Sequence, residues 1–264
     1  EYFFENPPPV VDQWSWQLLP DGLMFPAYLA AGRESRFASQ WMREKSGDSL
    51  WDIALGGRVG MLRYGNRDPL LPRGWQIDIE GAAFPRLTLD SRRDLVAVDF
   101  RFGVPITARF GKFETKLAYY HLSSHLGDEY LAKNAGAVRI NYARDVIVLG
   151  LAMRPHDDLR LYAEAGWAGY VSGGSQPWEF QFGVDYSPLA PTSIRGGPFF
   201  AVNGRIRQEL DFGGNVTAQT GWQWRGETGH LFRFGFHYLN GQTDVYQFFR
   251  EHEEQFAIGI WYDY

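Results

Sequence analysis

Apolar and polar residues alternate with a period of two along most of this 264-residue chain. The pattern is clearest at 199–238, where three alternating segments are joined by short glycine turns at 212–215 and 226–229. The third segment divides its side chains between two faces, namely Phe232, Phe234, Phe236 and Tyr238 on one and Arg233, Gly235 and His237 on the other. A period of two predicts β-strands, and the tight turns predict antiparallel neighbours.

About twelve segments follow this pattern, and no stretch has a strong helical period. A first strand is predicted at 25–29, and the pattern becomes clear from Trp51 onward. Further strands include 138–142, and the last is predicted at 256–262. Twelve strands leave roughly 22 residues for each strand with its connection, which suits a small membrane barrel.

Alternation alone is compatible with a soluble sandwich or lipocalin-like barrel, apolar inside, and with a membrane barrel, apolar outside. Three features favour the membrane. The polar faces carry glycine and charges of both signs, Trp and Tyr recur near the ends of the apolar faces, and the last strand ends on Tyr264. The sequence therefore predicts an all-β fold, a transmembrane antiparallel up-and-down β-barrel of about twelve strands over residues 23–264. Residues 1–22, with three consecutive prolines, are predicted to form an N-terminal periplasmic arm or plug.

The composition agrees with an envelope barrel. Aromatic residues make up 17% of the chain, with 10 Trp, and there are 30 Gly. The mean hydropathy is −0.33, and no apolar run is long enough for a transmembrane helix, which leaves membrane-spanning strands open. The net charge is −5 without a basic stripe, which argues against nucleic acid as a partner. The chain has no Cys, so it has no disulfide framework, and its start is typical of a mature protein after removal of a signal peptide.

The predicted strands assign alternate connections to opposite sides of a membrane. With both chain termini periplasmic, the extracellular connections lie near 43–50, 87–91, 125–136, 172–176, 211–214 and 241–253. The periplasmic ones lie near 65–73, 110–112, 154–157, 188–197 and 226–229. The two longest fall outside, as in known outer-membrane barrels.

The polar faces place many charges in the lumen. The predicted pore-lining residues are Asp78, Glu80, Asp99, Arg101, Glu114, Lys116, Arg139, Arg160, Glu164, Glu179, Asp185, Arg205, Arg207, Glu209, Arg225 and Arg233. Charges in a narrow lumen must pair or be hydrated. They therefore predict either a cross-braced lumen that is closed or nearly closed, or a narrow charge-lined pore, and the N-terminal arm could plug either one.

Several segments of the sequence resemble one bacterial protein family. LPDGLMFPAYLA (19–30), LWDIALGGRVGMLRYG (50–65), GWQIDIEGAAFPRL (74–87), YYHLSSHLGDEYL (119–131), PWEFQFGVDYSP (177–188) and the terminal WYDY are similar to domain of unknown function 1207. The resemblance covers nearly the whole chain. It implies a cell-envelope protein of Gram-negative-type bacteria, located in the outer membrane, and it implies no activity.

A short motif, His121-x-Ser123, resembles that of outer-membrane phospholipase A, also a twelve-stranded barrel. In that family the histidine and serine act from the lipid-facing wall, an asparagine orients the histidine, and calcium assists. By this resemblance Asn141 would be the orienting residue, although its parity places it on the lumen face unless a bulge intervenes. Asp128 and Glu129 are weak candidates for Ca²⁺ ligands. The alternative is that His121 and Ser123 only end a strand, and that the two acids form a solvated loop tip.

Three functions remain open at this stage. The first is an outer-membrane barrel, structural or a narrow charge-lined pore, without catalysis or cofactor. The second is a calcium-assisted lipid hydrolase that uses His121 and Ser123. The third is a soluble β-sheet binding module. For the two membrane functions, the expected partners are membrane lipid, lipopolysaccharide and other envelope proteins.

Overall fold

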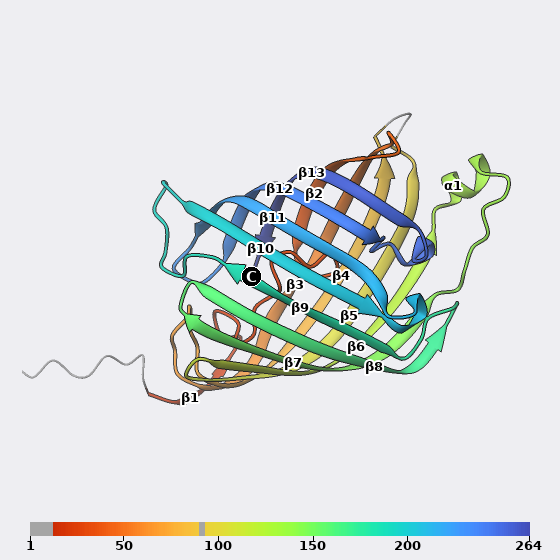
Figure 1. Ribbon diagram of the computed structural model, residues 1–264. Coiled ribbons are helices and arrows are strands. Elements are labelled where there is room, and N and C mark those ends of the chain that lie inside the picture. Colours follow the sequence, from red (N-terminus) through yellow and green to blue (C-terminus); the bar gives the residue numbers. More distant parts are fainter. Residues whose placement is uncertain (1–12, 90–92) are drawn as a thin grey trace, which may run out of the picture.

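The protein is a closed antiparallel β-barrel, seen from the side in Figure 1. The computed structural model describes residues 13–89 and 93–264. In this part of the chain, twelve long strands form the wall: β2 Phe37–Glu44, β3 Ser49–Gly65, β4 Gly74–Thr88, β5 Leu95–Phe110, β6 Phe113–Leu126, β7 Ala143–His156, β8 Leu159–Ser172, β9 Trp178–Tyr186, β10 Gly197–Arg207, β11 Gly213–Arg225, β12 Leu231–Gln242 and β13 His252–Asp263. Each strand pairs with its neighbours in the chain, and β13 pairs with β2 to close the wall. The predicted all-β, twelve-stranded barrel is confirmed.

Burial inverts the pattern of a water-soluble barrel. The inward side chains are largely charged and buried, for example Arg63, Arg144 and Asp99. The outward side chains are large, apolar and exposed, for example Phe102 and Leu149. An apolar outer wall around a polar interior is the arrangement expected in lipid. None of the described helices has the length and apolar character needed to cross a membrane.

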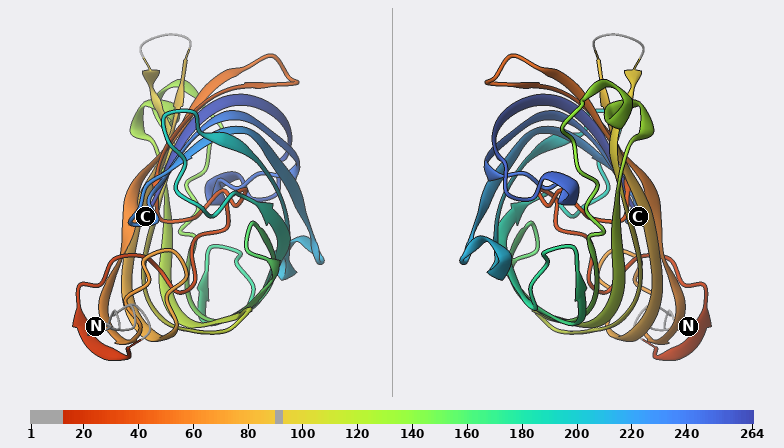
Figure 2. Two further views of the ribbon diagram at one scale, coloured as in Figure 1. Left: turned by 90° about the vertical axis from the view of Figure 1, so that its left-hand side faces the viewer. Right: turned by 90° about the vertical axis from the view of Figure 1, so that its right-hand side faces the viewer.

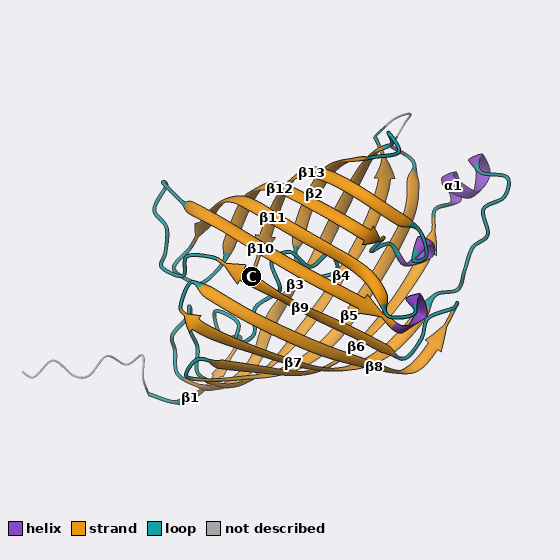
Figure 3. Ribbon diagram, viewed as in Figure 1, coloured by secondary structure: helices purple, strands orange, loops and turns teal. Residues whose placement is uncertain are grey.

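The two ends of the barrel differ. The short helices α1 (Asp128–Lys133), η3 (Gln208–Leu210) and η4 (Tyr246–Phe248) lie at one end, here called the helix end (Figure 3). The chain enters the barrel at the opposite end, beside the label β1 in Figure 1, and β13 also ends there, next to the start of β12; we call this the terminus end. Toward the helix end, the exposed Trp41 stacks on the half-buried Trp51 of the neighbouring strand. Trp16 and Trp75 meet edge to face at the terminus end. Aromatic groups therefore occur near both ends of the wall, as in membrane barrels.

The short strand β1 (Ser15–Leu18) and strand β2 share one edge of β3. The first pairs with β3 up to Leu62 and the second up to Leu55, so one strand position of the wall is filled by two separate pieces. Between them, residues 19–36 leave the wall and run through the lumen, where Figure 2 shows them inside the ring of strands. We call residues 19–36 the inner segment.

Two predicted strands are wrong. Residues 25–29 belong to the inner segment, where Phe25 and Tyr28 are buried. Their apolar character reflects burial inside the barrel and not a place in the wall. Residues 138–142 are irregular and lead into β7, because the chain there crosses the helix end before it can pair with β6. Strand β1 was not predicted. Residues 1–12 of the predicted arm lie outside the described residues, so the division at residue 22 stays a prediction.

Candidate functional site

The inner segment is held by arginines of the wall. An irregular backbone inside a barrel has carbonyl groups without strand partners, and these must be satisfied locally. Wall arginines donate to them between Asp21 and Leu29: Arg63 to Asp21 and Gly22 at 2.8 Å, Arg109 to Met24 at 3.0 Å, Arg58 to Phe25 at 2.9 Å and Arg233 to Leu29 at 3.2 Å. The guanidinium group suits this role because it presents five donors.

Side chains of the inner segment complete the contact. Arg33 pairs with Asp99 of β5 at 2.9 Å, and Arg36 pairs with Asp263 of β13 at 3.1 Å. The ring of Tyr28 stacks on that of Tyr162, with centroids 3.9 Å apart, and its hydroxyl donates to Glu164 at 2.8 Å. Ionic, aromatic and hydrogen-bonding contacts therefore all fix the segment to the wall.

Little space remains around the inner segment. Beside Ala31, Gly32 and Arg33 there is an enclosed cavity of about 10 Å³, roughly the volume that one water molecule needs. Toward the terminus end a second cavity of about 60 Å³ lies between Pro26 and Asp185. At the helix end a wider, open groove of about 520 Å³ lies between Arg86 and α1. The narrowest part of the lumen is thus filled by protein atoms.

Most of the predicted pore-lining charges lie inside the barrel and pair with one another. Glu114 accepts from Arg154 and Arg160 and also pairs with Arg109 at 2.9 Å. Glu179 pairs with Arg205 at 2.8 Å and Arg144 at 3.4 Å. Further ion pairs inside the barrel include Arg58–Asp78, Arg101–Glu80, Lys116–Glu164, Arg160–Asp185, Arg207–Glu209 and Arg233–Asp263. The interior is a connected ionic network.

One predicted lumen residue is elsewhere. Arg139 lies in the irregular stretch before β7, with about half of its side chain exposed, and it donates to Asp128 at 2.7 Å. The prediction is wrong because it treated 138–142 as a strand. Five buried arginines of the wall were missed, namely Arg58, Arg63, Arg86, Arg109 and Arg144. The signal was present for four of them, which have the parity of the inward residues of their strands, whereas the irregularity between Gly60 and Leu62 shifts the parity of Arg63.

A polar cluster interrupts the apolar outer wall. His121 of β6 faces Asp145 of β7 across the antiparallel pair, and Nδ1 of the histidine lies 2.6 Å from Oδ1 of the aspartate. The hydroxyl of Tyr119 donates to the same oxygen at 3.1 Å. Both His121 and Asp145 are partly exposed, at 45% and 35% of their side chains. Ser123 follows on the same face of β6, and among the described residues no hydrogen bond joins it to His121.

The proposed orienting residue differs from the sequence expectation. Asn141 is exposed in the irregular stretch before β7, and Asp145 occupies the position beside Nδ1 of His121. The alternation along β7 would have identified Asp145 as an outward residue, because it lies on the same face as Ile147. Asp128 and Glu129 lie in the first turn of α1. Among the described residues, no three His, Asp or Glu side chains gather as a metal site.

The helix-end groove is rich in acidic side chains. Glu44 and Glu253 lie around the buried Arg86, which also pairs with Asp52 at 2.7 Å. Burial, together with the negative charge of Glu253, raises the pKa of Glu251 in the neighbouring loop. The groove therefore combines a strong local negative charge with one fully paired arginine.

With this geometry established, the family can be assigned. A family model described as "Protein of unknown function (DUF1207)" matches residues 13–264. The chain belongs to the DUF1207 family. This confirms the resemblance seen in the sequence. No curated protein gives a significant sequence match to the chain.

Solved structures with a similar fold are outer-membrane barrels. The outer-membrane phospholipase A of Escherichia coli superposes with a TM-score of 0.57 at 9% identity, covering 89% of this chain and 98% of that protein. The calcium-bound dimer of the Salmonella typhi phospholipase gives 0.55 at 8% identity, with 89% and 92% covered. The KdgM porin gives 0.48 at 8% identity, with 86% and 98% covered. At these identities, the likeness to the phospholipases establishes the barrel fold.

Proposed function

We propose that this DUF1207 protein is a bacterial outer-membrane barrel whose resting state does not conduct, because its inner segment closes the lumen. The observation that carries this proposal is the set of hydrogen bonds from wall arginines to the backbone of residues 19–36. A narrow charge-lined pore would require that the inner segment move, and each of those contacts opposes such a movement. The protein then serves first as a closed structural element of the envelope.

The location is supported by three features of the wall. It exposes a continuous series of large apolar side chains, it has aromatic groups near both ends, and its fold is similar to that of outer-membrane phospholipases. We assign the helix end to the outside of a Gram-negative-type cell, since it has the longer connections, and the terminus end to the periplasm. Its surroundings are then membrane lipid, lipopolysaccharide and other envelope proteins.

Conductance in a planar lipid bilayer tests the closed lumen. The wild-type protein is expected to insert without steady current. Replacing both anchors of the inner segment, as in Arg33→Met with Arg36→Met, is expected to produce transient openings, because their pairs with Asp99 and Asp263 are lost. A steady ohmic current from the wild-type protein would refute the proposal.

A second function is favoured by the polar cluster on the wall. We propose that Ser123, His121 and Asp145 form a lipid acyl hydrolase site, in which Asp145 takes the orienting role expected of Asn141. The contact at Nδ1 leaves Nε2 of His121 free to accept the proton of the serine hydroxyl while Oγ attacks an ester carbonyl. His121 gives this proton to the departing alcohol of the lipid, and water then attacks the acyl-serine, which releases the fatty acid and restores the serine hydroxyl. A histidine–aspartate pair on a lipid-facing wall is energetically costly, and residues of this kind in a membrane usually have a function.

Release of fatty acid from phospholipid vesicles tests this second function, with calcium and with a chelator in parallel. Ser123→Ala should abolish release. Ser124→Ala is a matched control, because Ser124 is the adjacent serine on the opposite, buried face. No release from the wild-type protein in either condition, or equal release from both variants, would exclude the site. Faster release with calcium would support a cation near the wall.

A further inference from the structure

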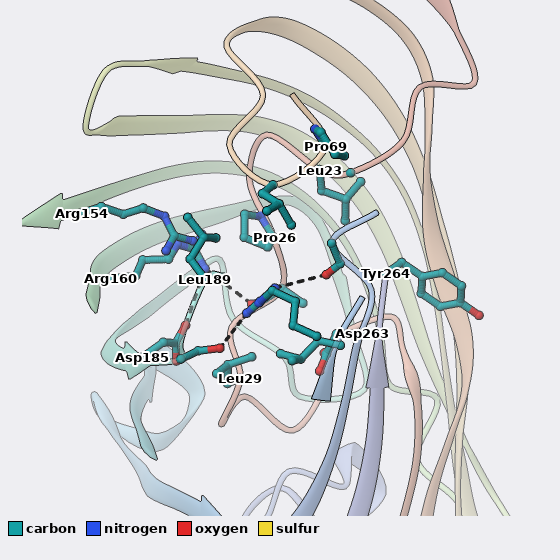
Figure 4. A pocket seen from close by; sticks show the side chains of 17 residues that line it. Leu23, Pro26, Leu29, Pro69, Arg154, Arg160, Asp185, Leu189, Asp263 and Tyr264 are labelled. Atoms are coloured by element: carbon teal, nitrogen blue, oxygen red, sulfur yellow. Dashed lines mark hydrogen bonds and ion pairs between the residues drawn. The ribbon is translucent and has the colours of Figure 1, made fainter. Parts of the chain in front are cut away.

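The cavity of about 60 Å³ at the terminus end has an unusual lining. It lies between the inner segment and the wall, and its charged lining consists of Arg154, Arg160, Arg225, Asp185 and Asp263 (Figure 4). By volume it holds several water molecules. Pro26 and Leu189 also line it, so it is partly apolar. This cavity is separate from the polar cluster on the outer wall.

Positive charge is in excess around the cavity. Three arginines, Arg154, Arg160 and Arg225, line it together with two aspartates, Asp185 and Asp263. The difference between these side chains, three minus two, is one positive charge. Arg225 shows the excess most directly, because its side chain donates to neutral oxygens of Pro188, Gly229 and Ser187 at 2.9, 3.2 and 2.7 Å. Hydrogen bonds to neutral oxygens do not cancel its charge.

Two side chains that line the cavity each have a buried polar atom without a partner. Nη2 of Arg160 and Oδ1 of Asp185 have no hydrogen bond, although the two residues are only 2% and 4% exposed. Their nearest atoms, Nη1 and Oδ2, are 3.6 Å apart, an ion-pair distance too long for a good hydrogen bond. Phe25 and Tyr28 stack against the Arg160 guanidinium at 4.5 and 5.2 Å, which fixes its orientation. Leaving such atoms unsatisfied is unfavourable, and because both residues line the cavity, a ligand there can complete the hydrogen bonding of this loosely paired couple.

The ligand must meet three conditions. It must carry negative charge to balance the excess, it must accept a hydrogen bond from Arg160, and it must donate one to Asp185. Hydrogen phosphate and phosphate monoesters in their monoanionic form combine P–O⁻ acceptors with a P–OH donor. Sulfate has the same shape but no proton near neutral pH. We propose that the terminus-end cavity binds a small phosphate-type oxyanion from the aqueous compartment, with Arg160 and Arg225 as donors and Asp185 as acceptor.

Calorimetric titration of the purified full-length protein in detergent tests this proposal at constant ionic strength. The probes are inorganic phosphate, glycerol 3-phosphate and sulfate. Phosphate is expected to bind saturably, and sulfate at least about tenfold more weakly, because a lost charged hydrogen bond has that effect. Binding of inorganic phosphate alone supports free phosphate as the ligand, and binding of both phosphates supports monoesters as well. Absence of saturable phosphate binding, or sulfate binding as tightly as phosphate, overturns the proposal.

Variants locate the site. Arg225→Gln should weaken the binding of phosphate and of sulfate alike. Asp185→Asn should reduce the ratio of phosphate affinity to sulfate affinity, because an amide also donates a hydrogen bond to sulfate. Arg144→Gln is the matched control, since Arg144 is a buried lumen arginine paired toward the helix end with Glu179. Equal loss in Arg144→Gln and Arg225→Gln would refute the assignment. Heat-dependent electrophoretic mobility checks folding, and if a variant fails to fold, the phosphate-to-sulfate ratio of the wild-type protein decides.

Discussion

Nδ1 of His121 lies 2.6 Å from Oδ1 of Asp145, and both side chains are on the apolar outer wall of the barrel. The two residues come from neighbouring strands and face each other directly in the antiparallel register. Their contact fixes one tautomer of the imidazole, with the proton on Nδ1 when the ring is neutral. This relationship is what distinguishes a potential serine-activating pair from a strand end.

If the wall site hydrolyses lipid, Asp145→Asn should lower the rate of fatty-acid release by at least about a hundredfold, because an amide can favour the wrong tautomer. Tyr119→Phe is the matched control. It removes the other hydrogen bond to the same carboxylate, at 3.1 Å, and should change the rate only slightly. The rates are compared in the vesicle assay, and an Asp145→Asn variant with wild-type activity would rule out the orienting role.

The buried pair of Arg33 and Asp99 should hold the inner segment in place. Arg33→Met and Asp99→Leu should each lower the free energy of unfolding by about 3 kcal/mol, since each leaves an uncompensated buried charge. The double variant should lose less than the sum of the two. Urea unfolding from lipid vesicles measures all three.

A surface pair provides the control for this cycle. Lys45 and Glu254 are 2.7 Å apart, but the lysine side chain is 76% exposed. Lys45→Met should leave the free energy of unfolding essentially unchanged, because exposed pairs are well solvated. Additive losses at Arg33 and Asp99 would mean that the two residues stabilise the barrel independently.

The closed lumen predicts the reactivity of introduced cysteines, since the chain has no Cys of its own. Ala30→Cys, in the inner segment and fully buried, should resist a water-soluble thiol reagent in the folded protein. Ser193→Cys, in an exposed loop at the terminus end, should react at once. Labelling is followed by mass spectrometry. Equal rates at the two sites would show that the inner segment leaves the lumen readily.

The close contact between Gly57 and Tyr264 predicts a steric effect at the break between β1 and β2. A Cβ atom on Gly57 would lie 2.7 Å from the Tyr264 ring. Gly57→Ala should therefore destabilise the barrel by about 1–3 kcal/mol, as overpacking does. Combining it with Tyr264→Ala should recover part of that loss. Gly81→Ala is the control, because the nearest atom to its Cβ is 3.7 Å away, and thermal unfolding compares all four proteins.

The wall could be predicted from the sequence because successive residues of a strand face the lipid and the lumen in turn. In β12, Phe232, Phe234 and Phe236 are exposed while Arg233 is buried, in the order that the alternation gives. Such local periodicity needs no knowledge of distant contacts. The same rule placed His121 and Ser123 on the outer face.

The inner segment could not be predicted in this way. Phe25 and Tyr28 are apolar and aromatic, as strand residues are, and only the lumen that surrounds them explains their burial. Their partners, such as Arg160 and Tyr162, are more than a hundred residues away in the chain. Segments without periodic burial carry no local signal of where they lie.

The sequence by itself thus determined an all-β barrel with an apolar wall and a charged interior, since both depend on local alternation. Only the tertiary structure decided that residues 19–36 run through the lumen, that Asp145 and not Asn141 meets His121, and that arginine exceeds carboxylate at the terminus end. The physical reason is the same in each case. Ion pairs, backbone satisfaction and cavities arise between residues that the closed barrel brings together, and their chain spacing has no fixed pattern.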